Sequence, residues 1–124
     1  MGLFDFRSRP RSFAYAIEGV WALLATQPNA RIHMLATVLV LGLAAYCDVE
    51  RWEWAVLVLV IACVWAVEAL NTAVESLADA CHPEQHPIIK RAKDVAAAAV
   101  LFLAIAAIVI AGIIFYPYIQ PLLG

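Results

Sequence analysis

The chain has 124 residues, of which 65% are hydrophobic and only 15% are charged. A soluble globular domain is about 45–50% apolar and about 25% charged, and so short a chain has too little interior to hide this excess. The composition therefore excludes an ordinary soluble enzyme domain. A formal net charge of −2 also argues against a nucleic-acid partner, which would need a basic surface. We expect one membrane domain over residues 1–124.

The first 28 residues predict a basic arm followed by an amphipathic surface helix. Residues 1–11 contain three arginines, and apolar residues then recur at helical spacing through residues 13–27. These apolar positions are Phe13, Ile17, Val20, Trp21 and Leu24. An apolar stripe flanked by arginines suits a helix that lies in the membrane interface. The alternative is a helix packed on a soluble core, for which the rest of the chain offers little material.

Three charge-free runs predict three transmembrane helices. We expect the spans over residues 29–47, 52–80 and 95–116, the second with a cytoplasmic extension. The third is the clearest, because its 22 residues carry no charge and Pro117 is expected to end it. A polar loop over residues 81–94 joins the second and third spans. The expected fold class is an all-α membrane protein with a surface helix and three spanning helices.

Charge asymmetry predicts the orientation of these spans. Seven of the eight lysines and arginines lie in the N-terminal region or at residues 90–93, whereas only Arg51 lies in the short acidic loop over residues 48–53. Positive charge is retained on the cytoplasmic side of a membrane. We therefore expect the N-terminus and the 81–94 loop to be cytoplasmic.

A polar stripe on the second span is the most informative feature of the sequence. Its members are Glu68, Asn71, Thr72, Glu75 and Asp79. At 100° per residue they fall on one narrow face, over about 16 Å of helix. Carboxylates near hydrocarbon are costly unless something neutralises them.

Two kinds of neutralising partner fit this stripe: a divalent cation, which prefers oxygen ligands, or basic groups such as Lys93. Glu68 lies deepest in the span, where a carboxylate is suited to act as a general base. The alternative is that the stripe only joins helices or faces the cytoplasm outside the bilayer. Because three spans cannot enclose such a stripe, we expect an oligomer. There is no glycine-rich phosphate loop, so a bound nucleotide would have to be held by metal, carboxylates and Lys93.

We assign no metal-binding role to the histidine and cysteine residues. We interpret His33 as a helix-interface residue rather than a ligand. Cys81, His82 and His86 lack a fourth ligand at the spacing of a zinc site.

Four sequence pieces together resemble the prokaryotic diacylglycerol kinase family, which includes undecaprenol kinases. They are S-F-A-Y-A-I-E-G (Ser12–Gly19), N-A-R-I-H (Asn29–His33), E-A-L-N-T-A-V-E-S-L-A-D (Glu68–Asp79) and R-A-K-D (Arg91–Asp94). They occur in the family's order over nearly the whole chain, and the two upstream pieces lean slightly towards the undecaprenol kinase branch.

The resemblance implies a homotrimer in the bacterial inner membrane, with a surface helix and three transmembrane helices per subunit. It implies composite active sites between subunits near the cytoplasmic face, where ATP and Mg²⁺ serve to phosphorylate a lipid hydroxyl. Undecaprenol and diacylglycerol are the two lipid alcohols that the family suggests.

The resemblance also implies roles for individual residues. Glu68 resembles the general base that activates the lipid hydroxyl, and Glu75 resembles a metal ligand. The residues that resemble or lie near nucleotide-binding positions are Arg9, Tyr15, Asn71, Asp79, His86, Lys93 and Asp94. One departure stands out: the family commonly has a second metal-binding glutamate four residues before the arginine that is Arg31 here, and this chain has Gln27. An amide oxygen can bind Mg²⁺ but brings no charge.

A different class of function remains open on the residues alone. A small non-catalytic membrane protein, which conducts ions or assembles partner helices, would also carry an intramembrane polar stripe. R-A-K-D favours the kinase, since a channel has no need of a cytoplasmic lysine and aspartate beside the stripe.

Overall fold

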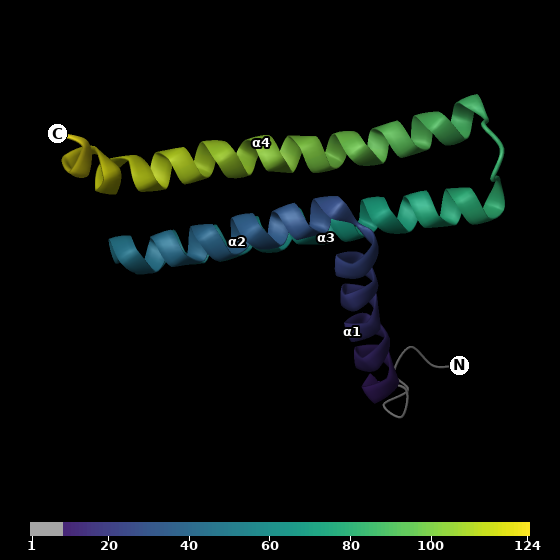
Figure 1. Cartoon of the computed structure of the whole chain (residues 1–124), viewed down its shortest axis with the longest axis horizontal. Coiled ribbons are helices and arrows are strands. Elements are labelled where there is room, and N and C mark those ends of the chain that lie inside the picture. The colour runs from purple at the N-terminus through teal and green to yellow at the C-terminus, as the bar shows by residue number, and fades with distance from the viewer. Residues whose placement is uncertain (1–8) are drawn as a thin grey trace.

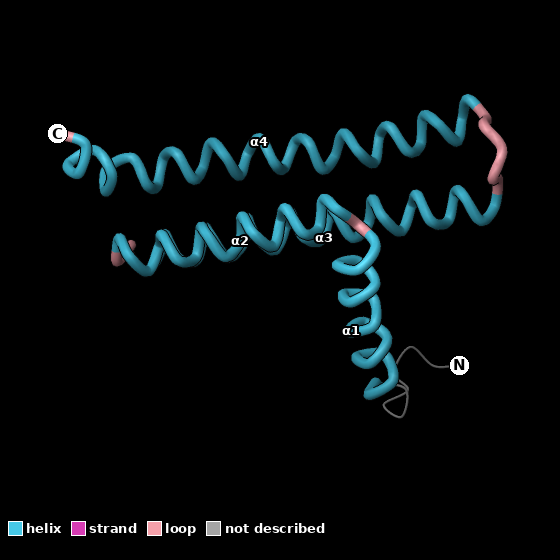
Figure 2. The backbone as a smooth tube through the Cα atoms, in the orientation of Figure 1, coloured by secondary structure: helices cyan, strands magenta, loops and turns pink. Residues whose placement is uncertain are grey.

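The described residues, 9–124, form four helices in the computed structural model, which for Arg9 describes the backbone alone. The helices are α1 (Arg9–Thr26), α2 (Pro28–Cys47), α3 (Arg51–Cys81) and α4 (Pro87–Leu123). Figure 1 shows α2, α3 and α4 running lengthwise together, while α1 points away from them at a steep angle. Short connections join the helices (Figure 2), so that α4 returns antiparallel along α3. The all-α fold expected from the sequence is confirmed.

The corner between α1 and α2 is fixed by backbone and arginine contacts. Gln27 is extended (φ −111°, ψ 114°) and Pro28 opens α2, a position where the missing N–H of proline is no loss. The Arg31 guanidinium turns back and donates to the carbonyls of Leu24 (3.1 Å) and Ala25 (2.8 Å). A cation near the last carbonyls of a helix is stabilising. The location of α1 in the membrane interface stays a prediction.

Three of the helices, α2, α3 and α4, are long and apolar enough to cross a membrane. They confirm a multi-pass membrane protein with three spanning helices. With 31 residues, α3 is about 46 Å long, which exceeds the roughly 30 Å of a hydrocarbon core. Helix α3 is therefore longer than the apolar layer is thick, and its last turns carry the polar residues Glu75 and Asp79. We call this end of the bundle, with the turn between α3 and α4, the projecting end.

Helix α4 is longer at both ends than the sequence predicted. The polar loop expected over residues 81–94 is present but shorter, over residues 82–86, because α4 already begins at Pro87, with His86 as its N-cap. The predicted helix end at Pro117 is wrong, since the helix continues through it to Leu123. Proline is tolerated within spanning helices, and the final turns are held by Tyr118 and Ile119, which pack against the buried core.

The buried core lies at the end of the bundle where α2 meets α3. It comprises Ala44, Val49, Leu57, Ile114 and Phe115. Of residues 48–53, predicted as an acidic loop, residues 48–50 do connect α2 to α3, whereas residues 51–53 already belong to α3. Glu50 and Glu53 form a capping box, which satisfies the first free N–H groups of the helix. Glu53 is buried and accepts a hydrogen bond from the Tyr118 hydroxyl of α4.

Candidate active site

The polar stripe of α3 passes from a buried to an exposed environment along the helix. Glu68 is only 1% exposed and Asn71 is 8% exposed. Glu75, one turn further, is half-buried, and Asp79 is exposed. The stripe thus connects the apolar interior of the bundle to its projecting end, where lipid and water-soluble groups could meet.

Glu68 has the largest fully buried side chain among the described residues. Its Oε2 atom has no hydrogen-bond partner in the described structure, and neither does Oδ1 of Asn71. Nε2 of His33 on α2 lies 3.4 Å from this Oε2 atom. Buried polar atoms are rarely left unpaired, and an intramembrane acid of this kind marks a functional site.

A second contact joins α2 to α3 one turn away. Trp65 Nε1 donates to Thr37 Oγ1 at 3.0 Å, and the Thr37 hydroxyl donates to the His33 carbonyl at 2.7 Å. The Trp65 ring meets the His33 ring edge-on, with centroids 6.3 Å apart. These contacts fix the register of the two helices and hold His33 opposite Glu68.

At the projecting end, Lys93 of α4 binds Asp79 of α3, with Nζ and Oδ1 2.5 Å apart. One turn along α4, Lys90 binds Asp94 at 2.6 Å. The structure therefore brings Lys93 to the exposed end of the polar stripe, as the sequence pattern indicated. Asp94 lies beside this end but is paired with Lys90 on its own helix.

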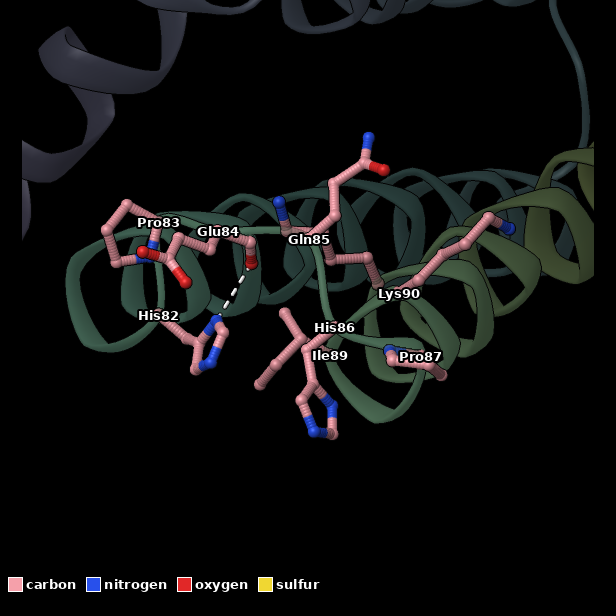
Figure 3. Close-up of a pocket in the computed structure, with 9 residues that line it drawn as sticks. His82, Pro83, Glu84, Gln85, His86, Pro87, Ile89 and Lys90 are labelled. Atoms are coloured by element: carbon pink, nitrogen blue, oxygen red, sulfur yellow. Dashed lines mark hydrogen bonds between the residues drawn. The ribbon is translucent and has the colours of Figure 1, made fainter.

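An open pocket of about 520 Å³ lies at the turn between α3 and α4. Its lining includes His82, Glu84, His86 and Lys93, and Figure 3 shows the two histidine side chains pointing the same way from the turn. His82 Nδ1 lies 2.8 Å from the Glu84 carbonyl. His86 Nδ1 accepts from the Ile88 N–H at 3.1 Å. The volume is within the range of small-molecule sites, about 300–1,000 Å³.

A smaller cavity of about 210 Å³ lies between α2, α3 and α4. His33, Thr37 and Trp65 line it together with apolar residues of all three helices. Its lining is almost wholly apolar, and His33, one of its few polar residues, also lies beside Glu68. A lipid with one hydroxyl has this distribution of polarity.

Other predicted site residues are not gathered at the stripe. Tyr15 is exposed on α1, and no hydrogen bond or ion pair of the described residues links it to α3. Gln27 is half-buried at the α1–α2 corner, where its side chain makes no capping hydrogen bond. The side chain of Arg9 lies outside the described residues.

The described side chains contain no group of three His, Cys, Asp or Glu that would hold a metal ion. This agrees with the way proteins use Mg²⁺, which is bound through one or two carboxylates while phosphates and waters complete its coordination. Glu75 is a hard oxygen donor of the right kind, and the unpaired Oδ1 of Asn71 is a second one. The donor set of the stripe therefore fits a magnesium–phosphate ligand better than a metal held by protein alone.

Sequence reasoning missed His33 as a site residue. It interpreted this side chain as interface packing, and the side chain is indeed half-buried between helices. The contact with Glu68 joins positions 35 residues apart and depends on helix register. The one signal in the sequence was the N-A-R-I-H piece of the family resemblance, which ends on this histidine.

The fold and this site define a class: a small multi-pass membrane protein whose buried carboxylate is linked, along one helix face, to an ion pair at the projecting end. The family model described as prokaryotic diacylglycerol kinase matches residues 14–115. The chain belongs to this family and is therefore a lipid kinase, a phosphotransferase.

The chain is similar in sequence to undecaprenol kinases and to diacylglycerol kinases. An undecaprenol kinase of Bacillus subtilis is 35% identical over 107 residues, which cover 86% of this chain and 87% of the relative. A diacylglycerol kinase of Synechocystis is 43% identical over 107 residues, again 86% of this chain but 61% of that longer relative. A diacylglycerol kinase of Escherichia coli K12 is 30% identical over 99 residues, 80% of this chain and 81% of the relative. The family favours the enzyme over the non-catalytic alternative.

Proposed function

We propose that this chain transfers the γ-phosphate of ATP to the hydroxyl of a membrane lipid alcohol, either undecaprenol or diacylglycerol, with Mg²⁺ as cofactor. The single observation that carries the proposal is the buried carboxylate of Glu68 with its unpaired oxygen. It begins a stripe that ends at Asp79, which is paired with Lys93 of α4. A base beside the apolar interior and a cation at the aqueous end are the two groups that such a transfer needs.

In the proposed reaction, Glu68 accepts the proton of the lipid hydroxyl. The lipid oxygen forms a bond to the γ-phosphorus, and the bond from that phosphorus to the bridging oxygen of ADP breaks. Positioning and charge neutralisation supply most of the catalysis in phosphoryl transfer. Removing a general base slows such reactions by about 10²- to 10⁴-fold.

Nucleotide binding is assigned to the projecting end. Lys93 would neutralise phosphate charge, and the amide of Asn71 together with Asp79, His86 and Asp94 would orient the nucleotide. The shared pocket of His86 and Lys93 supports this assignment, with Tyr15 and Arg9 contributing from the N-terminal region. Glu75 would hold Mg²⁺, with Gln27 as a neutral second ligand. When bound, Mg²⁺ would offset the charge that develops on the phosphates.

We further propose a homotrimer in the bacterial inner membrane, with the N-terminus and the α3–α4 turn in the cytoplasm. The exposed apolar side chains of the spanning helices, such as Leu70 (65% exposed) and Ile108 (73%), leave ample surface for lipid and for neighbouring subunits. Sites completed between subunits would bring Gln27 and Tyr15 of one copy towards the stripe of another.

The direct test is transfer of radiolabelled γ-phosphate from ATP–Mg²⁺ in mixed micelles, with undecaprenol and diacylglycerol offered separately. Label is expected in one lipid, and its rate of incorporation should fall by about 10²- to 10⁴-fold in Glu68→Gln. Glu53→Gln is the matched control, because it neutralises another buried carboxylate on the same helix, about 22 Å away. Equal label in wild type and Glu68→Gln would refute the assignment of the base.

A further inference from the structure

His33 faces the candidate base from a different helix. Its Nε2 atom lies 3.4 Å from Glu68 Oε2, an oxygen that has no hydrogen-bond partner among the described residues. His33 is one turn of α2 before Thr37, whose hydrogen bond to Trp65 ties α2 to α3. The imidazole is therefore held beside the carboxylate by contacts that are independent of the carboxylate itself.

We infer that His33 is a positioning residue for Glu68, which it holds in the orientation needed to take the proton of the lipid hydroxyl; this inference rests on the proposed function. A carboxylate has two oxygens, and a base works best when one is anchored and the other is turned to the substrate. An N–H at Nε2 provides the anchor for Oε2. A neighbouring partner that orients a base is a recurring feature of active sites.

The separation of 3.4 Å is slightly longer than a hydrogen bond, whose usual range is about 2.7–3.2 Å. Catalytic contacts are often long in the free enzyme and shorten when substrate binds. His33 also lines the cavity between α2, α3 and α4. A lipid chain entering that cavity would contact the imidazole, and we expect the gap to the carboxylate to close when it binds.

The experiment compares three substitutions of His33. In glutamine the amide nitrogen stands the same number of bonds from Cβ as Nε2, whereas in asparagine it stands one bond short and matches Nδ1. Leucine removes the donor and keeps bulk. We expect His33→Leu and His33→Asn to lower kcat by about 10- to 100-fold, the loss of one hydrogen bond to a charged group. His33→Gln should stay within about threefold of wild type.

The ratio of kinetic constants separates positioning from packing. KM for ATP should change by less than about twofold in His33→Leu, because the histidine acts on the base and not on nucleotide binding. In a Glu68→Gln background, His33→Leu should cause no further loss, since its effect passes through the carboxylate. A further multiplicative loss, or equal activity of the Gln, Asn and Leu variants, would overturn the inference.

A stability measurement tests the contact between His33 and Glu68 even if the proposed function is wrong. Melting temperatures of wild type, His33→Leu, Glu68→Gln and the double variant in detergent form a cycle that reports the contact without any turnover. Coupling between the two sites is expected, and additive shifts would overturn the pairing. If wild type phosphorylates neither lipid, the proposed function fails while the cycle still decides whether the two side chains interact.

Discussion

Lys93 of α4 and Asp79 of α3 form an ion pair at the projecting end of the bundle, with 2.5 Å between Nζ and Oδ1. The side chains remain 35% and 64% exposed, and exposed pairs contribute only about 0–1 kcal/mol to stability. The pair therefore holds a cation at the end of the stripe more than it holds the helices together.

Lys93→Met is expected to lower kcat/KM for ATP by at least about tenfold, because a phosphate-binding charge is lost. The free energy of unfolding should fall by no more than about 1 kcal/mol. Steady-state kinetics with varied ATP and denaturation in detergent would measure both. Asp79→Asn is the companion variant, and identical kinetics in the two would mean that the pair matters only as a pair.

Gln27→Glu is expected to lower the Mg²⁺ concentration needed for half-maximal activity severalfold, since it adds a negative charge to the proposed metal site. The corner should accept the change, because Gln27 is the N-cap of α2 and its side chain makes no capping hydrogen bond. A carboxylate at a helix N-terminus is favourable. Activity would be titrated with Mg²⁺ at fixed ATP, and an unchanged midpoint would remove Gln27 from the site.

Tyr118→Phe is expected to destabilise the fold by about 1–3 kcal/mol, because the buried carboxylate of Glu53 loses a hydrogen-bond donor. Its kcat should match wild type, since this contact lies at the end of the bundle away from the stripe. A melting curve would measure the loss of stability, and an activity assay would measure kcat. A large loss of kcat in the folded variant would show that the far end controls the site.

Native Cys81 offers a test of orientation. It is exposed at the end of α3, whereas Cys47 and Cys63 are half-buried. After both of these are replaced by alanine, a membrane-impermeant maleimide should label Cys81 only in cells whose inner membrane has been opened. Arg51→Cys, in a chain without other cysteines, is the control for the opposite side and should label in cells with an intact inner membrane. The reverse pattern would invert the proposed topology.

The three spans could be predicted from the sequence, because a long run of apolar residues without charges has few stable structures other than a membrane-spanning helix. The predicted bounds of α4 were wrong at both ends. Pro87 begins the helix because His86 caps it. The helix continues through Pro117 because Tyr118 and Ile119 pack against the buried core. The sequence anticipated the polar stripe, because residues on one helix face follow from spacing alone. The contacts of Glu68 with His33 and of Glu53 with Tyr118 were beyond it, since each depends on how separate helices align.

The stripe of α3 lies on one uninterrupted helix. The helix therefore fixes the distance between Glu68 and Asp79. The eleven steps of this segment set a fixed span of about 16 Å between the proposed base and the ion pair. Replacing an outward-facing residue in it changes neither distance nor direction. Inserting or deleting a single residue would turn one end by about 100° relative to the other. We therefore expect the segment to tolerate substitutions on its outer face better than any change in its length.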